Sequence, residues 1–387
     1  MSQASTPMSQ SRSEPKVVSG LDGVFVAQTT LSFVDGPGSE LYYRGIPVHE
    51  FIGTSSFEEV AFLLWYGKLP IKAELEALKK KLAAERQIPS EAIELIRKIP
   101  KKTHPMGVLR TLVSYAGLFD PQGGVFDPEV SLSQAYTLTA RFPGMIAAFY
   151  RIREGKEPVP SEPSLSHAAD FLYMMHAKKP DKEMTDALDA YLILLADHGL
   201  NASTFSARVT VATQSDLYSA ITSAIGTLKG SLHGGANQGA MEMILDIGSP
   251  EKAESYVRSL FEQKKKVMGF GHRIYKHKDP RAEAFRKLAR AVCERTGQSR
   301  FLDISDQVEK VMVEAKGIPC NVDFFSSSVL YALGFPVDFF TTVFAASRIA
   351  GWTAHVIEQQ KNNKLIRPEA EYTGPHNKHF IPLEARK

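Results

Sequence analysis

Apolar residues recur every three or four positions from about Phe57 onward, as in EEVAFLLWYGKLP (58–70) and ALDAYLILLADHG (187–199). This period is typical of helices with one buried face. Residues 24–43 differ, because β-branched and aromatic residues cluster there around the turn-forming residues 35–38. That pattern predicts one or two short hairpins. The predicted fold class is therefore mainly α, with a minor N-terminal β-hairpin.

Several helix boundaries can be read directly from the sequence. Ser249-Pro250 and Asp279-Pro280 each predict a helix start, and Gly297 and Gly317 stand where C-terminal caps are expected. No fixed-period repeat is present, so the pattern does not predict a helical solenoid.

The composition is that of an ordinary globular protein: 387 residues, 46 basic and 43 acidic side chains, and 43% hydrophobic residues. This length fits two domains. The first 20 residues are rich in Ser, Gln, Pro and Thr, which predicts a flexible tail without a secretory signal. Only Cys293 and Cys320 are available for a disulfide, so we expect a reducing cytoplasm. The small basic excess predicts no nucleic-acid partner, and no apolar run is long enough to span a membrane.

The first candidate for chemistry is His233, in SLHGGANQGAMEM, where a helical pattern begins within a few residues. A helix N-terminus disfavours an imidazolium, whereas a neutral imidazole there can donate a hydrogen bond to a developing oxyanion. The alternative is a histidine that caps its own helix.

A second glycine-rich segment, VMGFGHRIYKHKDPRAEAF, follows further along the chain. Gly269 and Gly271 allow a close approach of backbone to a ligand, and His272, Arg273 and Lys276 follow at once. The segment predicts a loop that binds phosphate or adenine, although a solvated basic turn explains it equally well. It lacks the third glycine of a dinucleotide-binding fingerprint.

Two further candidates lie near helix starts. Arg281 falls where helix polarity disfavours a cation unless an anion is nearby, either a bound carboxylate or the side chains of Asp279 or Glu283. Asp323, in CNVDFFSSSVLYALG, begins an apolar helix. An aspartate there is usually a cap, but in a dry cleft it can act as a general base.

Three other polar residues stand out in apolar or extended surroundings. Arg348 has no acidic residue within four positions, which predicts either a long-range acid or an anionic ligand. His198 lies between an apolar helix and a predicted Asn201 cap, and by itself favours a structural role. Arg367 precedes a proline, which predicts an extended segment that can reach another surface.

Other common chemistries lack their signatures. No Cys/His arrangement has the spacing of a metal site, and the chain has no GxSxG elbow and no Walker loop. Acid–base chemistry on a small anionic substrate remains.

Taken in order, the segments ADHGLNASTF, SLHGGANQGAM, VMGFGHRIYKHKDPRA, CNVDFFSSSVLY, RIAGW and NKLIRPEAEYTGP resemble citrate synthases of the short bacterial and archaeal type. The resemblance runs from about Gly20 to the C-terminus. It implies a mostly helical homodimer, with possible higher assembly, whose subunit has two domains. Residues 21–232 and 329–387 would form the large domain and residues 233–328 the small domain, after a tail of residues 1–20.

The resemblance also implies a role for each candidate. Asp323 would remove a methyl proton from acetyl-CoA, His233 would stabilise the enol or enolate, and His272 would protonate the ketone of oxaloacetate. The residues implied in holding the dicarboxylate are His198, Arg281, Arg348 and Arg367, the last from the other subunit. The residues implied in binding coenzyme A are Val267, Gly269, Phe270, Gly271, Arg273 and Lys276.

The implied activity is the condensation of acetyl-CoA with oxaloacetate and water to give citrate and CoA, an acyl transfer of the tricarboxylic acid cycle. No metal or cofactor is expected, since acetyl-CoA is a substrate. A 2-methylcitrate synthase would share this apparatus and use propionyl-CoA, because one methylene changes selectivity by only about 1–3 kcal/mol. The alternative from another class is an inert helical assembly or sensor protein that keeps the fold.

Overall fold

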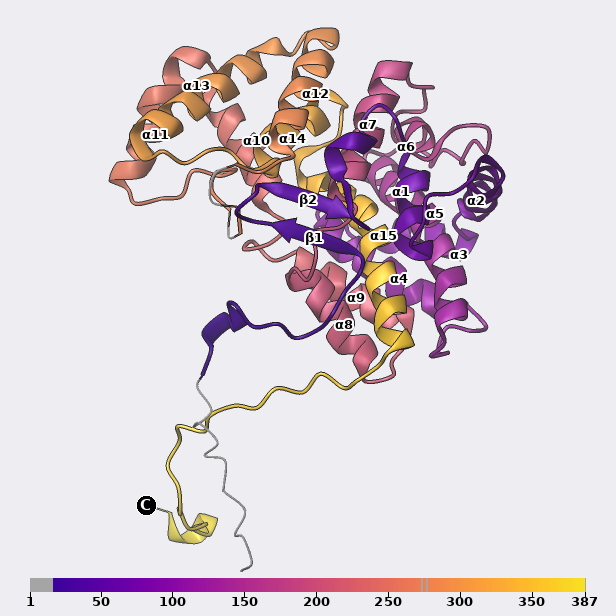
Figure 1. The fold of residues 1–387 in the computed structure, drawn as a ribbon, viewed down its shortest axis with the longest axis vertical. Helices are drawn as coiled ribbons and strands as arrows, with labels where there is room; N and C mark the ends of the chain where they lie inside the picture. The colour runs from indigo at the N-terminus through magenta and orange to yellow at the C-terminus, as the bar shows by residue number, and fades with distance from the viewer. Residues whose placement is uncertain (1–16, 273, 276–277, 387) are drawn as a thin grey trace, which may run out of the picture. The chain divides into compact units, whose positions relative to one another are not determined.

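The protein is described from a computed structural model, which covers residues 17–272, 274–275 and 278–386. The chain divides into two units. Residues 29–365 form one unit, and the other consists of residues 1–28 and 366–387. Within the described residues, the α-helices and the β-strands all belong to the unit of residues 29–365, which we call the helical unit (Figure 1).

The structure confirms the predicted mainly α fold class. The helices before the first glycine-rich segment are α1 (Phe57–Tyr66), α2 (Lys72–Glu85), α3 (Ser90–Lys98), α4 (Pro105–Gly117), α5 (Pro128–Arg153), α6 (His167–His176), α7 (Lys182–Leu195), α8 (Ala202–Ala212) and α9 (Leu217–Leu228). The helices that follow are α10 (Ala236–Ile247), α11 (Ala253–Glu262), α12 (Ala282–Arg295), α13 (Ser299–Lys316), α14 (Val322–Ala332) and α15 (Phe340–Lys361).

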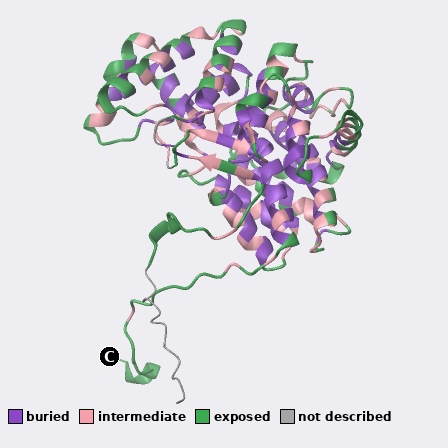
Figure 2. Ribbon diagram, viewed as in Figure 1, coloured by how far each residue is buried: buried purple, intermediate pink, exposed green. Residues whose placement is uncertain are grey.

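Helix α15 forms the centre of the core. Its side chains are buried along nearly the whole length (Figure 2), and it packs against α1, α5, α7, α8 and α9. Helices α10 to α14 pack mainly on one another, and α10 and α14 are adjacent.

The predicted N-terminal hairpin is present. Strands β1 (Ser32–Asp35) and β2 (Glu40–Tyr43) pair antiparallel, with Ser32 opposite Tyr43, and the turn between them is the predicted one. The strand pattern does not extend back to residue 24, because residues 24–30 form no strand. A third strand, β3 (Ile46–Pro47), pairs with β2 and was not predicted, because two residues are too short for a recognisable alternation.

The predicted helix boundaries agree closely with the structure. A 3-10 turn at Pro250 leads into α11, and α12 begins two residues after Pro280. Gly317 is the C-cap of α13, and Gly297 follows the C-cap of α12. None of the helices in the described part of the chain is both long and apolar enough to span a bilayer. The proposed division into large and small domains stays a prediction.

Candidate active site

The segment between α7 and α8 carries His198, and Asn201 caps α8 as predicted by accepting a hydrogen bond from the Thr204 N–H at 3.1 Å. His198 is buried. Its Nε2 lies 3.2 Å from the Tyr275 hydroxyl, and its ring centroid lies 5.4 Å from that of His272. The structure thus joins His198 to the second glycine-rich loop, 74 positions further along the chain.

The proton of His272 can be located from its contacts. The backbone N–H groups of Ile274 and Tyr275 both donate to Nδ1, at 3.1 and 3.0 Å. Since Nδ1 accepts, a neutral His272 carries its proton on Nε2. The Tyr275 ring lies against the imidazole, with centroids 4.5 Å apart. His272 is therefore set up as a hydrogen-bond donor through Nε2.

His233 does not cap its own helix, so that alternative is wrong. The N-cap of α10 is Gly235, without a side-chain hydrogen bond. Instead, Nε2 of His233 accepts from the Ser203 N–H at 3.3 Å, and lies 2.8 Å from the Ser203 hydroxyl, in the first turn of α8. A neutral His233 then carries its proton on Nδ1. Burial, together with the charge of Arg348, lowers the pKa of His233 to about 4, so the ring is neutral near pH 7.

Asp323 is not the cap of its helix either. Asn321 is the N-cap of α14 and accepts the Asp323 N–H at 2.9 Å, which leaves the Asp323 carboxyl available for another role. Burial raises the pKa of that carboxyl to about 6, against the lowering effect of Arg281. A carboxylate with such a pKa is a stronger base than an ordinary aspartate and is still largely ionised near pH 7.

The anion beside Arg281 is the local acid Asp279. Nε and Nη2 of Arg281 donate to the two oxygens of Asp279, each at 2.9 Å, and both residues are buried. Glu283, the other local candidate, pairs with Arg286. Burial lowers the pKa of Arg281, but the Asp279 carboxylate more than offsets this and keeps it above the usual range.

Arg348 is buried in the middle of α15 and, among the described residues, forms no ion pair. Its Nε donates to the Leu195 carbonyl at 2.7 Å, and its guanidinium lies 4.8 Å from the Phe344 ring centre. Burial lowers its pKa to about 10. Burial is the main cause that lowers the pKa values of His198 and His233, and the charge of Arg348 adds to that lowering. The same charge partly opposes the rise that burial causes in the pKa of Asp323.

Most of the candidate coenzyme A residues lie in one loop, which is bound to the start of α14. The Gly269 carbonyl accepts from the Asn321 N–H at 2.9 Å, and the Gly271 carbonyl accepts from the Asn321 side chain at 2.8 Å. Gly269 has φ +83°, and a Cβ there would lie 2.8 Å from Phe324. Val267 is buried and Phe270 pairs with Cys320. The loop therefore follows any movement of Asp323.

The remaining predicted site residues are placed as follows. Arg367 is exposed and belongs to the unit outside the helical unit. Arg273 and Lys276 lie outside the described residues. Within the residues that are described, no group of three or more His, Cys, Asp or Glu side chains is arranged to hold a metal.

Sequence reasoning missed the residues that support the site. Tyr43 bonds to both the N–H and the carbonyl of Asp197 through its hydroxyl, at 3.2 and 3.0 Å. Trp352 donates to the Ser203 hydroxyl at 3.1 Å. A buried acid directly before His198 was visible in ADHGLNASTF, but its partners come from distant segments and left no local signal.

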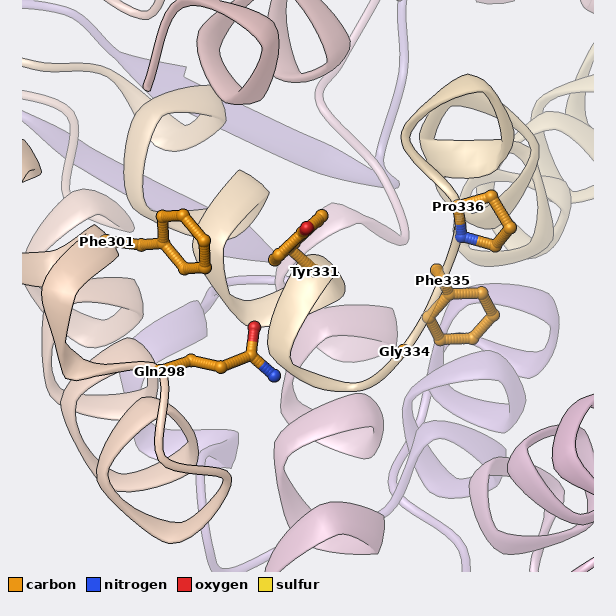
Figure 3. Close-up of a pocket in the computed structure, with 6 residues that line it drawn as sticks. All are labelled: Gln298, Phe301, Tyr331, Gly334, Phe335 and Pro336. Atoms are coloured by element: carbon orange, nitrogen blue, oxygen red, sulfur yellow. The ribbon is translucent and has the colours of Figure 1, made fainter. Parts of the chain in front are cut away.

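Two hollows flank Gly334 at the far end of α14, away from these residues. One has a volume of about 490 Å³ (Figure 3) and is lined by Gln298, Phe301, Tyr331, Gly334, Phe335 and Pro336. The other, of about 430 Å³, includes His176, Lys178, Asp181 and Arg295 in its lining. None of the predicted site residues that the structure describes lines either hollow.

Similarity to known proteins shows the family to which the chain belongs. The family model described as "Citrate synthase, C-terminal domain" matches residues 20–369. Citrate synthase 2 of Bacillus subtilis is 46% identical over 95% of this chain and 98% of its own. A 2-methylcitrate synthase of Mycobacterium tuberculosis is 42% identical over 95% of this chain and 93% of its own. A solved citrate synthase from Thermoplasma acidophilum, in a ternary complex with carboxymethyl coenzyme A and oxaloacetate, superposes with a TM-score of 0.91 at 33% identity, covering 96% of this chain and 100% of that one. The chain belongs to the citrate synthase family.

Proposed function

We propose that Asp323, His233 and His272 carry out the condensation of acetyl-CoA with oxaloacetate and water in this citrate synthase family enzyme. The observation that carries the assignment is the state of Asp323. Asn321 caps the helix, so the Asp323 carboxyl is available for chemistry, and burial raises its pKa to about 6. The charge of Arg348 influences the pKa values of Asp323, His198 and His233.

The first step is enolisation of the acetyl group. The Asp323 carboxylate takes a methyl proton, and the electron pair of the C–H bond moves toward the thioester oxygen. His233 donates a hydrogen bond to that oxygen through Nδ1, since its Nε2 accepts from Ser203. A neutral donor is suited to this task because its proton stays on the imidazole and is shared with the oxygen of the enolate that forms.

The second step forms the carbon–carbon bond. The enolate carbon attacks the ketone carbon of oxaloacetate, the thioester C=O is restored, and the ketone oxygen takes the proton that His272 holds on Nε2. The product is citryl-CoA, whose thioester water then cleaves to citrate and CoA. His198, Arg281 and Arg348 would hold the two carboxylates and so orient the ketone toward the enol. No step requires a metal or an added cofactor.

The test is the release of CoA thiol from acetyl-CoA in the presence of oxaloacetate. We expect turnover that depends on both substrates, and absence of turnover with acetyl-CoA and with propionyl-CoA would refute the assignment. The propionyl-CoA comparison also tests a second candidate, 2-methylcitrate synthase, which the 42% identity to a relative of that name favours. A higher kcat/KM with propionyl-CoA would support that activity.

We also infer that the enzyme acts as a homodimer in the cytoplasm, with Arg367 of one subunit completing the site of the other. The supporting observation is that Arg367 is exposed and forms no ion pair with any residue that the structure describes. Mixing subunits carrying Arg367→Ala with subunits carrying Asp323→Asn tests this. A shared site predicts that mixed dimers regain activity, because one of their two sites then has both residues intact, whereas a site contained in one subunit predicts no regain.

A further inference from the structure

One face of α15 follows the chain segment that leads into His198. Arg348, Gly351 and His355 are spaced by three and four positions, which places them in a row on one side of a helix. Arg348 Nε donates to the Leu195 carbonyl at 2.7 Å and the Gly351 N–H donates to the Ala196 carbonyl at 3.1 Å. One turn further along α15, His355 Nε2 lies 3.3 Å from Oδ2 of Asp197, the residue directly before His198.

The backbone contact at Gly351 shows how close this packing is. A Cβ at that position would lie 2.4 Å from the Ala196 carbonyl oxygen and 2.5 Å from Oδ1 of Asp197. Helix and segment therefore meet backbone to backbone, and any shift of α15 would move the segment that carries His198.

The direction of the hydrogen bond from His355 follows from its other neighbour. Nδ1 of His355 lies 3.1 Å from Nη1 of Arg208. Because a guanidinium only donates, Nδ1 must accept, and the imidazole proton is on Nε2, where it faces Asp197. Arg208 is itself held by Glu358 at 2.8 Å and by Gln359 at 2.9 Å. The chain of contacts that starts at the partly exposed Glu358 and passes through the buried Arg208 and His355 thus ends on the Asp197 carboxylate.

Asp197 links this chain to the site in two ways. Its Oδ2 also accepts from the Ser32 hydroxyl and from the Gly199 N–H, so the carboxylate bridges both sides of His198. Burial lowers the pKa of Arg348, and the charge of Asp197 is the largest effect that acts in the opposite direction. Burial raises the pKa of Asp197 itself, but His355, Arg348 and the Ser32 hydroxyl together more than offset this, so its pKa lies below the usual value and the carboxyl stays ionised.

We propose that His355 is a positioning residue for oxaloacetate. Oriented by Arg208 and Glu358, it holds the Asp197 carboxylate, and this carboxylate fixes the backbone on both sides of His198. The inference rests on the proposed function, because it gives His198 and Arg348 the role of binding the dicarboxylate. His355 does not touch substrate itself and acts only through Asp197.

The test compares two substitutions at one position with a control on the same helix. His355→Leu removes the donor to Asp197, whereas His355→Gln places an amide N–H where Nε2 stood. Thr342→Val is the control, since Thr342 is buried in the first turn of α15 and donates only to the Phe339 carbonyl. For each variant, we would measure the oxaloacetate Kd by calorimetry, the KM for acetyl-CoA, and the melting temperature.

We expect His355→Leu to raise the oxaloacetate Kd by about tenfold or more, the fold-change that loss of a hydrogen bond to a charged group produces. The KM for acetyl-CoA should change less than twofold. Gln at this position should recover most of the affinity, and Thr342→Val should keep both constants while lowering the melting temperature. In an Asp197→Asn background, His355→Leu should have little further effect on the Kd, because the two residues act as one unit.

A purely structural role for His355 predicts a different pattern. The melting temperature would then fall in His355→Leu while the oxaloacetate Kd stays within twofold of the wild type, and that result overturns the proposal. If His355→Leu does not fold, His355→Asn replaces it, since its shorter amide cannot reach Asp197, and equal Kd values for the Asn and Gln variants overturn the proposal in the same way. A wild-type enzyme that neither binds oxaloacetate nor releases thiol would instead overturn the proposed function and this inference with it.

Discussion

The substitution Asp323→Asn tests two effects of the buried carboxylate at the start of α14: its action as a base in condensation and its effect on stability. The substitution keeps the size of the side chain and removes its charge. Without the carboxylate, no base is available for the methyl proton, so we expect condensation to fall by about 10²–10⁴-fold, the usual range for a general base. Oxaloacetate binding should persist, because the groups proposed to hold it lie on other elements.

The magnitude of the effect on stability follows from the pKa. Burial raises the pKa of Asp323 from 3.8 to about 6. Each pKa unit corresponds to about 1.4 kcal/mol, so the ionised carboxylate lowers the free energy of unfolding by about 3 kcal/mol above pH 6. Below pH 3.8 the group is mostly protonated in both the folded and the unfolded chain, and little difference remains. Stability that depends on this group therefore decreases as the pH rises from about 4 to about 6.

Removing the charge should then stabilise the enzyme only where the carboxylate is ionised. For a chain of 387 residues, about 3 kcal/mol corresponds to a rise of about 4 °C in melting temperature. We expect that rise for ligand-free Asp323→Asn at pH 8 and none at pH 3.5, measured by calorimetry. Asp303→Asn makes the same chemical change on the exposed side of α13 and serves as the control.

Three outcomes would contradict this reasoning. A melting temperature that changes equally at both pH values would mean that the charge of Asp323 is not the cause. Condensation that continues at the wild-type rate would remove Asp323 from its role as the base. A shift as large in Asp303→Asn would point to net charge in place of local burial.

Three further predictions use the same assays. The kcat/KM for acetyl-CoA should rise with pH through about 6 and then level off, because Asp323 must be ionised to act as the base. His233, with a pKa of about 4, stays neutral over this range. A kcat/KM independent of pH from 5 to 8 would contradict this. Arg348→Met should raise the oxaloacetate KM by about 10–100-fold, because it removes a charge-assisted contact to substrate. The melting temperature should not fall, because the substitution also removes a buried cation. An unchanged KM would count against the role of Arg348. Gly269→Ala should lower the melting temperature more than Gly297→Ala, since both have a positive φ but only the new Cβ at 269 meets Phe324; equal losses would show that this close contact is relieved.

Much of the fold could be predicted because its signals are local. The three- and four-residue period indicates one buried face per helix. Helix ends are indicated by Asn201, Gly297 and Gly317. These features depend on neighbours within a few positions. The strand β3 could not be predicted in this way, because it consists of two residues that pair only after β2 has formed.

The contacts of the candidate site residues could not be predicted from the sequence. From the sequence, His233 and Asp323 could each either cap a helix or take part in chemistry. In the structure, another residue takes the capping role in both cases. Gly235 is the N-cap in place of His233, and Asn321 is the N-cap in place of Asp323. The proton positions depend on Ser203, which lies 30 positions from His233, and such a pairing leaves no pattern in the chain.

One carboxylate connects the proposed base to the proposed anion site. Asp279 binds the guanidinium of Arg281 and also accepts the Val322 N–H at 3.0 Å, at the first residue of α14. The same acid therefore holds Arg281 in place, fixes the turn before Asp323 and helps to raise the pKa of the base. His198 and Arg348, by contrast, are held by α7 and α15. In the proposed division into domains, Arg281 and Asp323 lie in the small domain, and His198 and Arg348 lie in the large domain. A dicarboxylate bound by both domains would bring Asp323 into position together with Arg281. Oxaloacetate binding would then be a condition for efficient deprotonation of the acetyl group.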